Sequence, residues 1–352
     1  MNASSDILFE RRGAAGVITL NRPQALNAVT HEMVRALART LVEWRDDPAV
    51  TRVVITAAGD RAFSAGGDIR ALYELGKAGR HEEALGFWRD EYPLNVLIKH
   101  YPKPYVALID GIVMGGGFGV SMHGSHRVAG DRFRFAMPEV GIGFFPDVGA
   151  TYLLPRLLGE IGAFIALTGE RLTGEEAVAT GVATHRVRSA HFAELSAALR
   201  GDDPVNAVLA QFEVPAGKAP IVARWPAIDR LLVHDRVEGI LAALDAEATG
   251  GEDAAWARSI AASIRTKSPT SLKIALRQMR LGPSLTFAAC MRTEFRIVSR
   301  IVHGRDFYEG VRAVLIDKDN SPRWRPSDLA GVSEAEVERH FAPLGANELD
   351  LT

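Results

Sequence analysis

The chain has 352 residues, of which 47% are hydrophobic and 24% are charged, and its formal net charge is −2 at pH 7. This balance gives no global positive field, which disfavours nucleic acid as a partner. No apolar run approaches the roughly 20 residues that a membrane-spanning helix needs, so we expect no membrane partner. The single cysteine, Cys290, excludes an intrachain disulfide and fits a reducing compartment.

The N-terminal segment does not resemble a targeting leader. Met1–Gly13 lacks the apolar core of a signal peptide, and its acidic Asp6 and Glu10 argue against a transit peptide. We therefore expect a bacterial-type cytoplasmic location, or a processed mature organellar form.

Strands and helices alternate in the first part of the chain, which is typical of an α/β fold. A helix is predicted after Thr30 as N-cap, with Met33, Leu37, Leu41 and Trp44 on one face, and it ends before Pro48. Strands are predicted at Val17–Leu20, Val53–Thr56, Tyr105–Ile109 and Arg127–Ala129.

Two glycine clusters each follow a predicted strand and precede a predicted helix. They are Phe-Ser-Ala-Gly-Gly-Asp-Ile at 63–69 and Met-Gly-Gly-Gly-Phe-Gly at 114–119. Glycine lets a backbone approach a ligand closely, and helix N-termini offer N–H groups and the positive end of the helix dipole. Together the two turns could direct two N–H donors at one developing oxyanion. Taken singly, each cluster also fits an ordinary tight turn.

The segment 136–147 carries two carboxylates, Glu139 and Asp147, among almost no other polar side chains. A carboxylate in apolar surroundings is costly to desolvate, so it needs partners or a raised pKa. Such groups are candidates for acid, base or nucleophile roles. The same residues also allow a structural interpretation, with Glu139 partly exposed at a strand end and Asp147 as N-cap of a helix over Val148–Leu158.

The sequence becomes mostly helical after about residue 188. The stretch Asp202–Pro226 contains four prolines and is predicted to be a loop-rich join. We therefore expect a core over 1–200, which contains both glycine clusters and the candidate carboxylates, and a mostly helical region over 201–352. Helices are predicted at Ala190–Arg200, Asp253–Lys267, Thr270–Leu281, Ser284–His303 and Asp306–Val314.

Several other chemistries lack their motifs in this sequence. It has no Gly-x-Ser-x-Gly, which argues against an α/β-hydrolase nucleophile elbow. It also has no P-loop and no complete Gly-x-Gly-x-x-Gly, which disfavours nucleoside triphosphates and NAD. His123 and His126 have no clustered third ligand, so we interpret them as packing or surface histidines and expect no metal site.

In combination, these segments resemble the crotonase (enoyl-CoA hydratase/isomerase) superfamily and, within it, the 3-hydroxyisobutyryl-CoA hydrolase branch. The resemblance covers most of the chain and is weakest over Ser189–Gly251. It implies an α/β fold with a ββα spiral core and a helical C-terminal part packed over the active site, covering the CoA. The segments that carry it are Val17–Ala28, Ala65–Arg70, Phe87–Asn95, Lys103–Ser121, Phe135–Arg156, Ser268–Met279 and Arg305–Pro326.

The resemblance also implies catalytic roles by position. The oxyanion hole would be the N–H groups of Gly67 and Gly116. Hydratases of the family carry two catalytic glutamates, of which this chain keeps Glu139 but has Gly119 at the other position. Asp147 matches an aspartate of the hydrolases, where hydratases usually have glycine. The loss of one glutamate argues against hydration, which needs an acid and a base beside the double bond.

Binding roles follow from the same resemblance. Glu91 matches a substrate-pocket position of the hydrolases, although by itself it also fits a solvated acidic helix face. The resemblance implies that Asp68, Gly116, Glu139 and Asp147 also bind the substrate. Many relatives have lysine where this chain has Gln24. The expected CoA-binding residues, any of which could instead be an ordinary surface group, are Arg22, Ala65, Arg70, Lys273 and Arg277.

The expected function is hydrolysis of the thioester of 3-hydroxyisobutyryl-CoA, and also of 3-hydroxypropionyl-CoA, in valine catabolism. No cofactor is needed, because CoA is part of the substrate, and a homo-oligomer is expected from the family. Two alternatives stay open. One is an enoyl-CoA hydratase or isomerase, which Gly119 disfavours, and the other is a non-catalytic CoA-binding protein.

Overall fold

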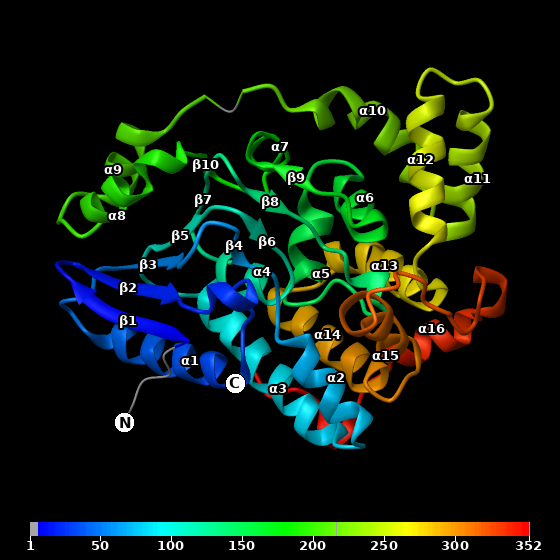
Figure 1. The fold of residues 1–352 in the computed structure, drawn as a ribbon, viewed down its shortest axis with the longest axis horizontal. Coiled ribbons are helices and arrows are strands. Elements are labelled where there is room, and N and C mark those ends of the chain that lie inside the picture. The colour runs from blue at the N-terminus through cyan, green and yellow to red at the C-terminus, as the bar shows by residue number, and fades with distance from the viewer. Residues whose placement is uncertain (1–5, 216, 352) are drawn as a thin grey trace. The chain divides into compact units, whose positions relative to one another are not determined.

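Ten β-strands form two sheets in the computed structural model, which describes residues 6–215 and 217–351 (Figure 1). The larger sheet has the order β1-β2-β3-β5-β7-β10, in which only β1 and β2 are antiparallel neighbours. The smaller sheet has the order β4-β6-β8-β9. The strands are β1 (Ile7–Arg12), β2 (Ala15–Leu20), β3 (Arg52–Ala57), β4 (Ala62–Ser64), β5 (Tyr105–Ile109), β6 (Ile112–Val113), β7 (His126–Ala129), β8 (Arg134–Phe135), β9 (Leu172–Thr173) and β10 (His185–Arg186).

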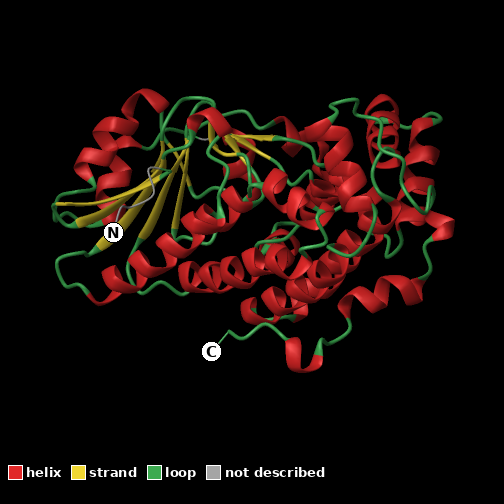
Figure 2. Ribbon diagram, turned by 60° about the horizontal axis from the view of Figure 1, so that its bottom comes forward, coloured by secondary structure: helices red, strands yellow, loops and turns green. Residues whose placement is uncertain are grey.

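The chain divides into two compact units that alternate along the sequence. The first contains Met1–Asp68, Asp90–Ala136 and Arg171–Val222 and holds both sheets, which Figure 2 shows as two groups of yellow strands. The second contains Ile69–Arg89, Met137–Glu170 and Ala223–Thr352. The functional roles expected for 1–200 and 201–352 stay predictions.

The central strands of the larger sheet are buried on both faces, as is usual for parallel strands. All five residues of β5 are buried. Apolar side chains of β2, β3, β5 and β7 pack with those of α8 (Phe192–Ala198) and α9 (Val205–Phe212) into one core. The four predicted strands correspond to β2, β3, β5 and β7 and are confirmed.

The first helix, α1 (His31–Asp46), is confirmed with its predicted cap. The Thr30 side chain accepts the backbone N–H of Met33 at 3.2 Å. On β2, a Cβ added at Gly16 would lie 2.3 Å from the Trp44 ring. Glycine at this position therefore lets α1 pack close against the sheet.

The smaller sheet is absent from the sequence prediction, because its strands are only two or three residues long and show no periodicity. Its strands β4 and β6 are parallel neighbours. The carboxyl ends of both strands therefore lie on the same side of the sheet. Both glycine clusters lie there, and α4 (Gly116–Ser121) begins within the second of them.

The C-terminal part of the chain is helical, as predicted, and has no β-strand among its described residues after Glu213. Helix α3 belongs to the second unit up to Arg89 and to the first from Asp90. The other helices are α2 (Ile69–Lys77), α3 (His81–Lys99), α5 (Ala150–Leu153), α6 (Ile161–Thr168), α7 (Gly174–Thr180), α10 (Pro220–Leu232), α11 (Val237–Ala248), α12 (Ala254–Arg265), α13 (Pro269–Leu281), α14 (Phe287–Ile301), α15 (Asp306–Val311) and α16 (Glu334–Phe341).

The prediction of a loop-rich join over Asp202–Pro226 is wrong. This stretch contains all of α9 and the first half of α10, with Pro226 inside the helix. Val205, Val208 and Leu209 of α9 are buried in the core of the first unit. The helical spacing of these apolar residues outweighs the local preference of the prolines for loops.

Among the residues that the structure describes, no helix has the length and apolar character needed to cross a membrane. The prediction that Met1–Gly13 is not a leader falls partly outside the described residues.

Candidate active site

The two glycine turns lie next to each other in the first unit. Gly67 follows β4, and Gly116 is the first residue of α4 after β6. A Cβ added at Gly116 would lie 3.0 Å from the backbone nitrogen of Gly67. The parallel pairing of β4 and β6 therefore brings the two peptide groups together.

The hydrogen bonds on either side of Gly67 direct its N–H away from the neighbouring segment at Val29. Val29 donates its N–H to Gly66 O at 2.8 Å, and Asp68 donates to Val29 O at 2.9 Å, which leaves the Gly67 N–H on the other side. The N–H of Gly116 belongs to the first turn of a helix, where intrahelical acceptors are lacking. Among residues 6–215 and 217–351, neither N–H has a backbone acceptor. This geometry suits an oxyanion hole.

Glu91 on α3 lies beside this pair. Its side chain is buried, and its Oε1 would be 3.0 Å from a Cβ at Gly116. The sequence also allowed Glu91 to lie on a solvated acidic face of the helix. Its neighbour Asp90 lies on that face instead, and it bonds to His31 at 2.7 Å and to Arg35 at 2.6 Å. The alternative interpretation of Glu91 is therefore wrong.

The second unit holds the carboxylates Glu139 and Asp147, which are only 6% and 5% exposed. Glu139 begins a 3-10 turn, Glu139–Ile142, rather than ending a strand in solvent, so the exposed alternative is wrong. Burial, and then the negative charge of Asp147, raise the pKa of Glu139 well above its ordinary value. Within the described residues, Oε2 of Glu139 has no hydrogen-bond partner. A buried carboxyl of raised pKa is suited to act as base or nucleophile near neutral pH.

The interpretation of Asp147 as a helix N-cap is wrong. Helix α5 begins at Ala150, after Val148 and Gly149 with φ of +51° and +90°. The N–H groups of Gly149 and Thr151 donate instead to the two carboxylate oxygens of Glu294, at 2.8 and 2.9 Å.

Glu294 is a further site residue that sequence analysis missed. It is fully buried on α14, and burial followed by the charge of Asp147 raise its pKa to about 8. The available signal was its position on the apolar face of α14, in step with Met291, Ile297 and Val298. A carboxylate in a row of apolar residues at helical spacing indicates a buried polar contact.

The turn after Asp147 is also held by α13. The amide nitrogen of Gln278 donates to Pro146 O at 2.9 Å and to the Thr151 hydroxyl at 2.7 Å. Gln278 is fully buried, as is Glu294. Two helices from the C-terminal part of the chain thus fix the backbone on both sides of Asp147.

The CoA-binding candidates of the first unit have partners within that unit. Arg22 donates to Ala28 O at 2.8 Å and pairs with Asp6 and Asp68, each at 3.2 Å. Asp68, expected to bind substrate, is therefore a partner of Arg22. The N–H of Ala65 donates to Leu26 O at 2.9 Å. The proposed roles of these residues stay predictions.

The candidates of the second unit also have internal contacts. Lys273 is 8% exposed, and its ammonium bonds to Glu238 and to Val332 O, at 2.8 and 2.9 Å. Arg277 pairs with Glu338 at 2.9 Å. Arg70 donates to Leu315 O at 3.2 Å. The contacts of Lys273 give it a structural role, and a CoA role for all three stays a prediction.

The two histidines interpreted as packing or surface groups both have protein contacts. His123 lies edge-on to Phe118, with ring centroids 5.3 Å apart. His126 bonds through Nε2 to the Asn206 side chain at 2.7 Å. Within the described part of the chain, no group of three or more histidine, cysteine or acidic side chains is placed to hold a metal ion.

Two similar proteins from different organisms carry the same enzyme name. The 3-hydroxyisobutyryl-CoA hydrolase, mitochondrial, of Danio rerio is 46% identical over 99% of this chain and 92% of that protein. The enzyme of the same name from Homo sapiens is 43% identical over 99% of this chain and 91% of that protein.

Two solved structures share the whole fold but carry other names. A carnitinyl-CoA dehydratase from Mycobacterium thermoresistibile has a TM-score of 0.93 at 42% identity, covering 99% of each chain. An enoyl-CoA hydratase from Rhodobacter sphaeroides has a TM-score of 0.91 at 41% identity, covering 98% of this chain and all of the other. The predicted α/β fold class, with a helical C-terminal region, is confirmed. Since the enoyl-CoA hydratase/isomerase family model matches residues 15–341, the chain belongs to that family.

Proposed function

We propose that this protein hydrolyses the thioester of 3-hydroxyisobutyryl-CoA to the free hydroxyacid and CoA, as in valine catabolism, and also accepts 3-hydroxypropionyl-CoA. The observation that carries the proposal is the buried pair of Glu139 and Asp147. The names of the relatives from Danio rerio and Homo sapiens support it.

The dehydratase and hydratase names of the two similar structures favour a second candidate, hydration of an enoyl-CoA. Gly119 argues against it, because addition of water across a double bond needs both an acid and a base. Gly119 is buried and supplies neither. Hydrolysis of a thioester needs one base or nucleophile and a stabilised oxyanion, and the chain has the groups for both.

In the proposed reaction, the N–H groups of Gly67 and Gly116 stabilise the negative charge that grows on the thioester oxygen. The Glu139 carboxylate either attacks the carbonyl carbon, giving a mixed anhydride that water then cleaves, or takes a proton from an attacking water. In both routes the carbon–sulfur bond breaks and CoA leaves as the thiol. The raised pKa makes Glu139 a stronger base than an exposed glutamate.

Asp147 and Glu91 are proposed to read the 3-hydroxyl of the substrate. Both carboxyl groups are buried, so a substrate hydroxyl that binds them does so away from bulk water. Sites that hydrogen-bond a substrate hydroxyl reject analogues that lack it strongly. We therefore expect isobutyryl-CoA to be a poor substrate.

The test is release of free thiol from 3-hydroxyisobutyryl-CoA, measured beside isobutyryl-CoA and methacrylyl-CoA. Rapid release from the hydroxy thioester alone supports the proposal. Hydration of methacrylyl-CoA without thiol release would establish the hydratase instead, and tight thioester binding with no turnover would indicate a non-catalytic CoA-binding protein.

The matched variants are Glu139→Gln and, as control, Glu82→Gln at an exposed position of α3. Glu139→Gln should lose nearly all turnover and still bind the thioester, whereas Glu82→Gln should match the parent chain. Retained turnover in Glu139→Gln would remove this residue from the mechanism.

The proposal includes a bacterial-type cytoplasmic location and a homo-oligomer. The relatives named above are mitochondrial enzymes, which leaves the compartment of this chain to be tested by fractionation. Light scattering of the purified chain tests the assembly.

A further inference from the structure

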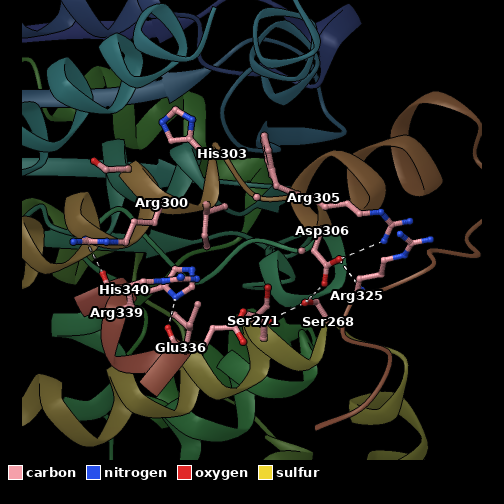
Figure 3. A pocket seen from close by; sticks show the side chains of 17 residues that line it. Ser268, Ser271, Arg300, His303, Arg305, Asp306, Arg325, Glu336, Arg339 and His340 are labelled. Carbon is pink, nitrogen blue, oxygen red and sulfur yellow. Dashed lines mark hydrogen bonds and ion pairs between the residues drawn. The ribbon is translucent and has the colours of Figure 1, made fainter. Parts of the chain in front are cut away.

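The second unit contains a cavity of about 400 Å³ that includes none of Glu139, Asp147 and Glu294 (Figure 3). Its walls come from the start of α13, the end of α14, the start of α15 and one face of α16. The cavity is therefore separate from the carboxylates of the proposed reaction, and what it binds is a separate question.

The lining of this cavity has an excess of positive charge. Four arginines line it, Arg300, Arg305, Arg325 and Arg339, against two carboxylates, Asp306 and Glu336. Counting the histidines as neutral, the lining carries a formal excess of two positive charges. Figure 3 shows Arg305 and Arg325 on one side of the cavity, with Arg300, Arg339 and His340 on the other.

Asp306 compensates only part of this positive charge, through a long ion pair with Arg305. Asp306 accepts hydrogen bonds from the Ser268 hydroxyl and from the backbone N–H of Arg325, both at 2.9 Å. Its closest guanidinium is that of Arg305, at 3.8 Å. Within the described residues, the guanidinium groups of Arg325 and Arg339 have no carboxylate within 4.0 Å.

The hydrogen bonds of Arg300 leave its charge available to a ligand in the cavity. Arg300 donates to the carbonyl oxygens of Arg296 and His340, at 3.0 and 3.3 Å, rather than to a carboxylate. Burial, and then repulsion from Arg296 and Arg339, lower the pKa of Arg300. An anion in the cavity would relieve that repulsion.

One wall of the cavity is formed by polar residues at the N-terminal end of a helix. Ser268, Thr270 and Ser271 line it at the N-terminal end of α13, a helix of 13 residues. Helix N-termini carry partial positive charge and favour anions. Ser268 already caps the Ser271 N–H at 3.3 Å, so this helix end contributes through its dipole, in the same direction as the arginines.

We propose that this cavity is a binding site for a small phosphate monoester. Such a group carries about −1.5 to −2 charge at pH 7, which matches the formal excess of two positive charges. The guanidinium group offers paired N–H donors that fit phosphate oxygens. This proposal does not rest on the thioester reaction.

The test is calorimetric titration of the full chain with glycerol 3-phosphate, with glycerol as the uncharged control. The double variant Arg325→Ser/Arg339→Ser removes the two arginines that lack carboxylate partners. Arg39→Ser/Arg171→Ser, at exposed positions of the first unit, is the matched control. Thermal melting of both variants verifies that each is folded.

The parent chain and the control should bind glycerol 3-phosphate equally and glycerol not at all. The cavity variant should bind about tenfold or more weakly, because it loses charge-assisted hydrogen bonds. No binding by the parent chain, or equal binding by the cavity variant, would overturn the proposal. Equal affinity of the parent chain for succinate would overturn the assignment to phosphate.

Discussion

Glu294 accepts a hydrogen bond from the backbone N–H of Gly149 at 2.8 Å, although the two residues are 145 positions apart in the sequence. The other carboxylate oxygen accepts the N–H of Thr151. Glu294 therefore caps α5 in place of Asp147. The charge of Asp147 contributes to the raised pKa of both Glu139 and Glu294.

The variant Glu294→Gln should change how stability depends on pH. The pKa of this buried carboxyl is about 8 in the folded chain, against an ordinary value of 4.5. A raised pKa means that the folded chain holds the proton over this range while the unfolded chain loses it, so folding stability falls as pH rises from about 4.5 to 8. Because glutamine does not titrate, the melting temperature of the variant should fall less over that interval. Parallel melting-temperature curves for the two chains would contradict the expectation.

The same variant should be less stable at acidic pH, where Glu294 is protonated in the parent chain. Glutamine offers one acceptor oxygen to two N–H donors, and a buried unsatisfied donor costs about 1–3 kcal/mol. Denaturant unfolding at pH 5 measures the loss. Glu82→Gln serves as the exposed control and should leave the free energy of unfolding unchanged.

Asp147→Asn should move the pH dependence of turnover. The negative charge of Asp147 raises the pKa of Glu139, so its removal lowers that pKa. Since the proposed reaction needs ionised Glu139, the rising limb of kcat against pH should shift toward acid. The measurement is thiol release from pH 5 to 9, and a limb that stays in place would show that Asp147 does not act on Glu139.

Gly116→Ala should impair the proposed oxyanion hole. The added Cβ would lie 3.0 Å from both the Gly67 nitrogen and Glu91 Oε1, so these groups would have to shift. Loss of one oxyanion donor typically costs on the order of 100-fold in rate. Gly250→Ala is the control, since a Cβ there meets nothing within 4 Å. Thiol release that survives Gly116→Ala undiminished would exclude this peptide from the chemistry.

Lys273→Met should separate a structural role from a CoA role. The side chain of Lys273 is 7% exposed and bonded to Glu238 and Val332, and its loss should cost about 1–3 kcal/mol of stability. The exposed pair of Arg277 with Glu338 predicts little change in stability for Arg277→Met. A raised KM for the CoA thioester with an unchanged melting temperature would support a CoA role for Lys273.

The sequence by itself determined the elements whose signals are local. Thr30 and the apolar face of α1 set the start and orientation of that helix, because capping and helical spacing act within a few residues. The buried run Tyr105–Ile109 set β5 in the same way. The glycine clusters and the apolar surroundings of Glu139 were also visible, which is why the candidate site could be named before the fold was known.

Only the tertiary structure decided how these residues act on one another. The pairing of β4 with β6 brings Gly67 to Gly116, and strands of two or three residues have no sequence period that could predict it. Glu294 reaches the turn after Asp147 from a distant helix. Desolvation and charge, which set the pKa of Glu139, depend on what surrounds a carboxyl in space, and that surrounding is assembled from segments far apart in the chain.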